Sequence, residues 1–368
     1  MKQRITWAAG VLLVLSTGSF AQQLPTRSDL MAKAARTFLA KLTAEQRQLA
    51  MRELNDQAAR TSWHYLPEDR ASRLGVTLAL LTPEQRHAVH EMLVAALSSQ
   101  GYGKLTHIMW LEELLRASEG AALKISTAVG APLNKQRARF ESRDPSKYWV
   151  VVFGEPGTAN WGWTFSGHHF AVNFTVASGR VAFTPMFLGA NPQTVVDGEH
   201  AGERTLQHEI DKAFRLVRSL KPKLRQAVVL SSTVPATITA DKGRKGEVTT
   251  FQGLPADQLS TNQRQLLMSL VDEFLGDASE EAAAAQRALV EKDGLAALRF
   301  AWWGQTDESA RRFMYRIHGP SILIEMAREQ NPDGTPANHV HSIVRDPRND
   351  YGEAWLQQHY QEFHQQQP

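Results

Sequence analysis

The stretch Tyr148-Trp149-Val150-Val151-Val152-Phe153-Gly154 sets the fold class of this sequence. Its β-branched and aromatic residues are typical of a buried β-strand. Further along, residues 161–176 and 180–188 predict two more strands or a longer folded ribbon, with Ala177-Ser178-Gly179 as a hairpin turn between them. A second set of strands is expected at residues 312–318, 321–326 and 339–344. The sequence therefore predicts an antiparallel or mixed β-sheet.

Helical patterns fill most of the remaining sequence. Between residues 28 and 123, apolar side chains such as Leu30, Ala34 and Phe38 recur every three or four positions, which places them on one face of a helix. Because no low-complexity linker interrupts the chain, we expect residues 22–368 to form a single α+β domain with helices on one face of the sheet. The expected order is helical 28–123, strands 148–188, helical 203–300, strands 312–344 and a C-terminal helix 351–364.

Two pairs of helix starts recur at the same spacing. Leu42-Thr43…Arg47 is repeated as Leu81-Thr82…Arg86, and both starts are capping boxes. The same spacing separates Leu220…Arg225 from Leu259-Ser260…Arg264. Each pair is followed by a strand-rich region. An internal duplication is one interpretation of this pattern, and the other is that good helix caps resemble one another.

The first 21 residues predict a cleavable secretory signal peptide. Lys2 and Arg4 precede an apolar run, and Ser19 and Ala21 occupy the small-residue positions before a cleavage site. The run is too short to span a hydrocarbon core of about 30 Å, and no later segment is long and apolar enough to do so. We therefore expect the mature protein to be periplasmic or secreted.

Composition narrows the chemistry further. The 41 Lys and Arg residues nearly balance the 38 Asp and Glu residues, which gives no electrostatic footprint for nucleic acid. The chain has no cysteine, so any metal site must use His, carboxylate and water. Phosphate-binding loops, the G-x-S-x-G elbow of serine esterases and the zinc-protease H-E-x-x-H pattern are all missing from the sequence. A small-molecule substrate or ligand is the expected partner.

Histidines provide the main functional signal. In His339-Val340-His341 both imidazoles point to the same face of a strand, about 7 Å apart, and can reach one metal ion. His168 and His169 alternate to opposite faces of the strand expected over 163–176, and one of them can supply the third imidazole. Glu325 can supply a carboxylate. The same residues could instead form an acid–base or ligand site without metal, or make structural hydrogen bonds.

Arginines near these segments are candidates for the catalytic site. Arg316 shares a strand face with His318, and Arg345 follows the His-x-His pair. Either arginine could orient an anionic substrate group or a ligand histidine, or form a solvated ion pair. Tryptophans within 161–163 and 302–303 could line a ligand pocket or fill the core.

A set of short motifs is shared with a known protein family. The motifs are Trp161-Gly162-Trp163, Gly167-His168-His169, Asn173-Phe174-Thr175, Phe187-Leu188-Gly189-Ala190-Asn191-Pro192, Asn338-His339-Val340-His341, Arg345-Asp346 and Asn349-Asp350-Tyr351-Gly352. Together they resemble the bacterial family called domain of unknown function 3500. The resemblance covers nearly the whole mature chain and implies one family-length unit with the histidine segments in its signature, but it implies no reaction. The sequence departs from the family after Glu325, where Met326-Ala327-Arg328 replaces a polar Tyr-Asp-Asn-like stretch.

The leading hypothesis is an exported metal-dependent enzyme of the hydrolase type. His339, His341 and one of His168 and His169 would hold Zn²⁺ or another divalent ion. Glu325 would be a fourth ligand or the general base acting on metal-bound water. The alternatives are a non-enzymatic periplasmic binding protein for a small molecule, and a redox protein with copper or iron at the histidine-rich site.

Overall fold

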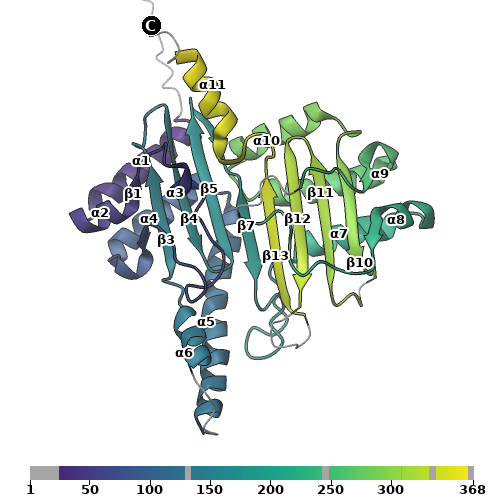
Figure 1. The fold of residues 1–368 in the computed structure, drawn as a ribbon, viewed down its shortest axis with the longest axis horizontal. Helices are drawn as coiled ribbons and strands as arrows, with labels where there is room; N and C mark the ends of the chain where they lie inside the picture. Colours follow the sequence, from purple (N-terminus) through teal and green to yellow (C-terminus); the bar gives the residue numbers. More distant parts are fainter. Residues whose placement is uncertain (1–24, 129–133, 243–247, 308, 331–336, 364–368) are drawn as a thin grey trace, which may run out of the picture.

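The computed structural model describes residues 25–128, 134–242, 248–307, 309–330 and 337–363. Within them, 11 helices accompany one mixed sheet of 13 strands, which confirms the α+β class (Figure 1). The predicted signal peptide lies outside the described residues. None of the helices in the described ranges is both long and apolar enough to cross a membrane.

The first half of the chain contributes one side of the sheet. Its strands follow the order β1-β3-β4-β5-β7, while β2 pairs with β3 and β6 pairs with β5. The strands are β1 (Met51–Arg52), β2 (Val76–Thr77), β3 (Tyr148–Phe153), β4 (Asn160–Gly167), β5 (Phe170–Ala177), β6 (Arg180–Ala182) and β7 (Met186–Ala190). The helices are α1 (Arg27–Lys41), α2 (Ala44–Ala50), α3 (Gln57–Arg60), α4 (Pro83–Ala96), α5 (Ser99–Ala128) and α6 (Asn134–Ser142).

The second half contributes the other side, in the order β13-β12-β11-β10-β8, with β9 paired to β10. The strands are β8 (Val229–Ser231), β9 (Leu254–Pro255), β10 (Arg299–Gly304), β11 (Phe313–Gly319), β12 (Ile322–Glu329) and β13 (His339–Arg345). The helices are α7 (Gln207–Ser219), α8 (Pro222–Val228), α9 (Thr261–Leu275), α10 (Glu280–Asp293) and α11 (Glu353–Phe363). The two halves join where β7 pairs antiparallel with β13.

The two halves repeat one arrangement of elements. In each, a short strand pairs parallel with the first long strand (β1 with β3, β8 with β10), and a second short strand pairs antiparallel with the same partner. Equivalent glutamines in the first turns of α4 and α9 also make equivalent bonds. Gln85 donates to the carbonyl of Lys41 (2.7 Å), and Gln263 donates to the carbonyl of Ser219 (2.9 Å). The two halves thus share one arrangement of elements, and the interpretation of the spaced helix starts as an internal duplication stays a prediction.

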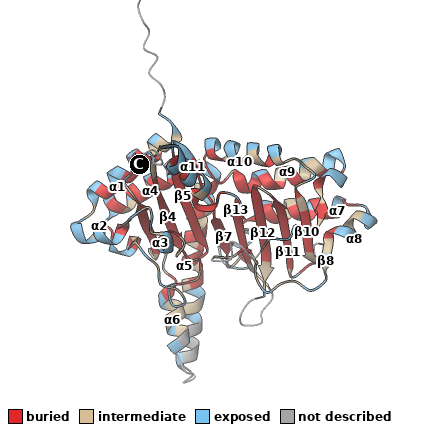
Figure 2. Cartoon of the chain, turned by 45° about the horizontal axis from the view of Figure 1, so that its top comes forward, coloured by how far each residue is buried: buried red, intermediate tan, exposed pale blue. Residues whose placement is uncertain are grey.

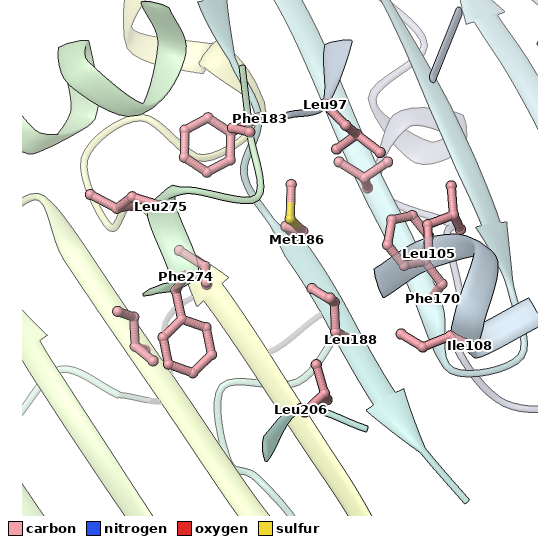
Figure 3. Close-up of a cluster of buried hydrophobic side chains, with 14 of the residues drawn as sticks. Leu97, Leu105, Ile108, Phe170, Phe183, Met186, Leu188, Leu206, Phe274 and Leu275 are labelled. Atoms are coloured by element: carbon pink, nitrogen blue, oxygen red, sulfur yellow. The ribbon is translucent and has the colours of Figure 1, made fainter. Parts of the chain in front are cut away.

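Most helices cover one face of the sheet, and the two halves share a core beneath them (Figure 2). At the junction, Met186 and Leu188 of β7 face Leu105 of α5 from the first half and Phe274 of α9 from the second (Figure 3). The opposite face is covered by two extended segments. The first strap (residues 61–75) contributes Trp63 and Tyr65 to a second apolar cluster, and the second strap (residues 232–242 and 248–253) contributes Ile238 and Ala240.

Some predicted element boundaries were wrong. The region expected to be helical up to residue 300 gives way to β10 at Arg299, because Phe300-Ala301-Trp302 is inserted between other strands of the sheet. The segment 161–176 is not one continuous strand. It turns back at His168-His169, where His169 takes a left-handed backbone conformation (φ 62°). The alternation argument for these two histidines therefore does not hold, because both lie in the β4–β5 turn.

Candidate metal site

Two histidines enter the site from the start of β13. Strand alternation directs His339 and His341 to the face of the sheet that the straps cover, while Val340 between them joins the core under the helices. The centroids of their two rings are 4.4 Å apart. Tyr65 of the first strap and Phe187 of β7 stack on each other and both make edge contacts with the His341 ring, so aromatic contacts fix the position of this imidazole.

The third histidine comes from the β4–β5 turn. The Nε2 atom of His169 lies 2.9 Å from the Nε2 atom of His339. The intervening residue on β7 is Gly189, and a Cβ atom there would lie 2.9 Å from Cδ2 of both His169 and His341. Only glycine therefore leaves room for the imidazoles to approach one another across β7.

These three imidazoles form a group with metal-binding geometry. One ligand atom from each of His169, His339 and His341 lies within 4.8 Å of the others. Nitrogen atoms that share a tetrahedral zinc ion lie roughly 3.3 Å apart, since Zn–N bonds are about 2.0–2.1 Å. Nδ1 of His341 contacts Oε1 of Glu329 at 2.9 Å, whereas its Nε2 is buried with no hydrogen-bond partner among the described residues. That unsatisfied nitrogen is the atom available to a metal ion.

His168 lies beside this group but has other partners. Its ring stacks on His169 with centroids 3.7 Å apart. Its Nδ1 makes a short contact with Glu112 of α5, and both ring nitrogens lie within hydrogen-bond distance of Arg143 (3.0 and 3.2 Å). Glu112, His168 and His169 form a second group of potential metal ligands. A guanidinium against both nitrogens of His168 opposes a metal ion there, so the geometry favours His169 as the third ligand.

Burial favours the neutral form of His169 and of His339. It lowers the pKa of His169 well below the usual value, and the neighbouring histidines lower it further. Burial, followed by the proximity of His341, lowers the pKa of His339 to about 3. Burial raises the pKa of Glu112 to about 8. Burial would also raise the pKa of Glu329, but His341, with Thr237 and His339, more than offsets this and leaves that pKa lowered. Metal binding requires neutral imidazoles, so these directions suit a ligand site.

The histidines open into a pocket of about 380 Å³. The first strap forms one wall with Tyr65 and Arg70. Another wall consists of Glu119 of α5, Arg139 of α6 and Arg143, which directly follows α6. Arg143 is buried and pairs with Glu119 at 3.1 Å. The helical hairpin that carries these residues extends beyond the ends of the strands (Figure 1). Three arginines and one glutamate give this lining a net positive charge, which favours anionic ligands.

Three sequence-predicted residues do not join the histidines. Glu325 is fully buried, and its oxygens are taken by Arg316 and by the Thr239 and Ala240 backbone amides of the second strap. Arg345 binds the carboxylate of Asp350. These residues anchor the second strap and the C-terminal segment, so the structure does not support their predicted catalytic roles.

Sequence reasoning missed Glu112, Glu329, Arg139 and Arg143. Glu329 is the carboxylate beside the His-x-His pair, because it stands opposite His339 in the β12–β13 ladder. A strand prediction that continued past Met326 would have placed Glu329 on the same face as Glu325. Ala327, within the stretch that departs from the family pattern, lies opposite His341 and is buried.

The fold and site define an α+β protein with a buried three-histidine cluster at the base of an arginine-lined pocket. The chain belongs to the family DUF3500, described as protein of unknown function, whose family model matches residues 25–353. The resemblance drawn from the sequence motifs is thus confirmed. No characterised protein and no solved structure gives a significant match to the chain.

Proposed function

We propose that this protein is a metal-dependent enzyme of the hydrolase type that acts on a small anionic substrate. His169, His339 and His341 would hold a divalent ion such as zinc. The observation that carries the proposal is the convergence of these imidazoles, from two separate segments of the sheet, at the base of a pocket. Three histidines are a common ligand set for catalytic zinc, and they leave a position open for water or substrate.

The surrounding side chains have separate proposed roles. A bound divalent ion would supply a Lewis acid and lower the pKa of a bound water molecule. Glu329 accepts from Nδ1 of His341 and so fixes the tautomer that presents Nε2 to the site. Arg143, with Arg70 and Arg139 nearer the mouth, would bind the anionic group of the substrate. In this scheme these arginines take the role that the sequence assigned to Arg316 and Arg345.

We propose that Glu112 and His168 hold a proton beside the part of the bound substrate that reacts. With a pKa raised to about 8, the Glu112 carboxyl is mostly protonated at neutral pH. It contacts Nδ1 of His168, whose ring stacks on His169. The pair could therefore donate a proton toward the pocket without an exposed acid.

One observation favours a second candidate, a binding protein that uses no metal. The separation of 2.9 Å between Nε2 of His169 and Nε2 of His339 is a normal hydrogen-bond length. One imidazole can donate to the other directly, and the arginines would then bind an anion beside a purely organic site. This candidate and the metal-dependent enzyme differ in metal content.

Metal analysis of protein purified without a histidine tag tests the proposal. After reconstitution with zinc and removal of excess metal, we expect about one equivalent per chain. His169→Ala, His339→Ala and His341→Ala should each lose it, whereas His87→Ala, at an exposed position on α4, should retain it. Folded wild-type protein that retains no zinc or other divalent metal would support the metal-free binding protein and refute the enzyme.

Export is proposed from the N-terminal sequence alone. The supporting features are Lys2 and Arg4 before the apolar run and the small residues that end at Ala21. Expression of the full chain in a bacterium followed by N-terminal sequencing of the periplasmic fraction is the test. We expect a mature chain that begins near residue 22. Recovery of the chain from the cytoplasm alone, with its N-terminal segment intact, would refute export.

A further inference from the structure

A second polar pocket lies on the helix-covered side of the sheet. Its volume is about 450 Å³, and α7 and β12 contribute most of its lining. Arg328 of β12 stands opposite Val340 in the ladder and therefore shares the face that the helices cover. The pocket contains four arginines and one carboxylate, from Arg204, Asp211, Arg215, Arg218 and Arg328, with Ile210 and Phe214 as its apolar floor.

The carboxylate of Asp211 in this lining is already neutralised. The two terminal guanidinium nitrogens of Arg204 donate to the two carboxylate oxygens of Asp211, at 2.9 and 2.6 Å. This bidentate geometry satisfies both carboxylate oxygens. Among the residues that the structure describes, the lining has no further acidic side chain, so Arg215 and Arg328 add their positive charge to the pocket.

Arg328 is the group that most needs a counter-ion. Among the described residues its guanidinium donates to two neutral oxygens, at 3.3 Å to the carbonyl of Ala310 and 3.2 Å to Oε1 of Gln193, and it lies over the Phe313 ring. Its Nε atom is buried and has no hydrogen-bond partner among the described residues. Burial lowers the pKa of Arg328, and the like charge of Arg204 lowers it further. A partly buried guanidinium without a carboxylate is costly, and an oxyanion would offset that cost.

We propose that this pocket binds a small soluble oxyanion with two or more negative charges, such as pyrophosphate or a compound with a phosphoryl group. The planar guanidinium matches the oxygens of such an anion, and several arginines together match its multiple charges. The site is separate from the histidine pocket. The two pockets share no lining residue, and Arg328 and its neighbour Glu329 point to opposite faces of β12. The proposal does not depend on a metal at the histidines.

Calorimetric titration with inorganic pyrophosphate tests the site. The protein is first dialysed against EDTA, so that pyrophosphate cannot bind through a metal ion. We expect the double variant Arg215→Gln/Arg218→Gln to bind at least about tenfold more weakly than wild type. Both side chains are exposed on α7, so the variant should fold. The matched control is Lys221→Gln/Lys223→Gln, which removes the same charge from exposed positions outside the pocket.

The control variants show whether pyrophosphate binds in this pocket or elsewhere on the protein. Lys221→Gln/Lys223→Gln and the histidine-pocket variant Arg70→Gln/Arg139→Gln should both bind pyrophosphate within about threefold of wild type. Failure of the wild type to bind would overturn the proposal. So would equal weakening in the lysine control, which would mean general electrostatic attraction. Weakening in Arg70→Gln/Arg139→Gln alone would place the anion in the histidine pocket and would also overturn it.

Discussion

At the scale of single residues, the contact between Glu329 and His341 is the most informative feature of the candidate site. Glu329 lies at the end of β12, and Oε1 is 2.9 Å from Nδ1 of His341. A carboxylate on the far nitrogen fixes the ring and raises its basicity as a ligand. With the proton on Nδ1, the lone pair is on Nε2, which is the buried nitrogen that has no hydrogen-bond partner among the described residues.

Replacement of Glu329 should therefore weaken metal binding without removing any ligand. We expect Glu329→Ala to lower zinc affinity by roughly 10–100-fold, measured by competition with a chromophoric chelator. Glu329→Gln retains an acceptor for Nδ1 and should lie between Ala and wild type. Unchanged zinc affinity in Glu329→Ala would contradict the orienting role assigned to this carboxylate.

The sequence predicted the histidines of this site but not their carboxylates. His339 and His341 share a face in any strand, so their proximity follows from alternation alone. The choice between Glu325 and Glu329 depends on which residue stands opposite His339, and that register is set by pairing between strands. The contact between Glu112 and His168 joins α5 to a turn far along the chain, and no local pattern specifies it.

At the scale of elements, each half requires a glycine with positive φ at the equivalent position before its second short strand. Gly75 precedes β2 with φ +108°, and Gly253 precedes β9 with φ +99°. A Cβ atom at Gly75 would lie 2.4 Å from the carbonyl oxygen of Val150, and one at Gly253 would lie 2.3 Å from that of Phe300. In both halves the chain thus passes directly against the first long strand as the strap ends.

Alanine at either glycine should destabilise the fold by a similar amount. The positive φ and the clash with a backbone oxygen act together, and we expect Gly75→Ala and Gly253→Ala each to lower the free energy of unfolding by about 2–4 kcal/mol. Urea denaturation gives the comparison. Gly103→Ala on α5 is the control, since a Cβ atom there has no neighbour within 4 Å, and it should be neutral or stabilising. A neutral effect at only one of the two strap glycines would contradict their structural equivalence.

Strands were predicted correctly where a long run of β-branched and aromatic residues marks them. Strands that form only because they pair with a distant strand were missed. The runs that became β3 and β12 contain enough β-branched residues to be recognised locally. Strands of two or three residues, such as β1 and β8, exist only because a distant strand lies beside them. The strand β10 follows closely after α10, and its tryptophans fit either a helix or a strand when seen without their partners.

At the scale of the whole molecule, a buried charge cluster ties the two halves together on the helix side. Lys104 of α5, from the first half, lies 2.6 Å from Glu209 of α7, 2.8 Å from Asp277 after α9 and 3.1 Å from Glu273 of α9. Both Glu209 and Asp277 are almost fully buried, and burial raises the pKa of Asp277. Lys212 of α7 also pairs with Glu273, at 2.6 Å. The ammonium group of Lys104 therefore chiefly compensates Glu209 and Asp277, which could not otherwise be buried together.

Removal of this lysine should destabilise the molecule more than any exposed lysine would. In Lys104→Met the apolar stem is retained and the charge is lost, and we expect a decrease of about 3–5 kcal/mol in the free energy of unfolding at pH 8. The unpaired carboxylates would bind protons more tightly in the folded state than in the unfolded state. Stability of the variant should then fall as pH rises, so its deficit relative to wild type should be smaller at pH 5 than at pH 8.

The pH comparison separates lost charge compensation from lost packing. Lys33→Met, at an exposed position on α1, changes the same atoms without touching a buried carboxylate and should cost little at either pH. A deficit in Lys104→Met that is equal at pH 5 and pH 8 would mean that the side chain acts by filling space. A deficit that shrinks on acidification would mean that the docking of the two halves depends on this ammonium group. The charge cluster would then add to the β7–β13 ladder and the shared apolar core as a connection between the halves.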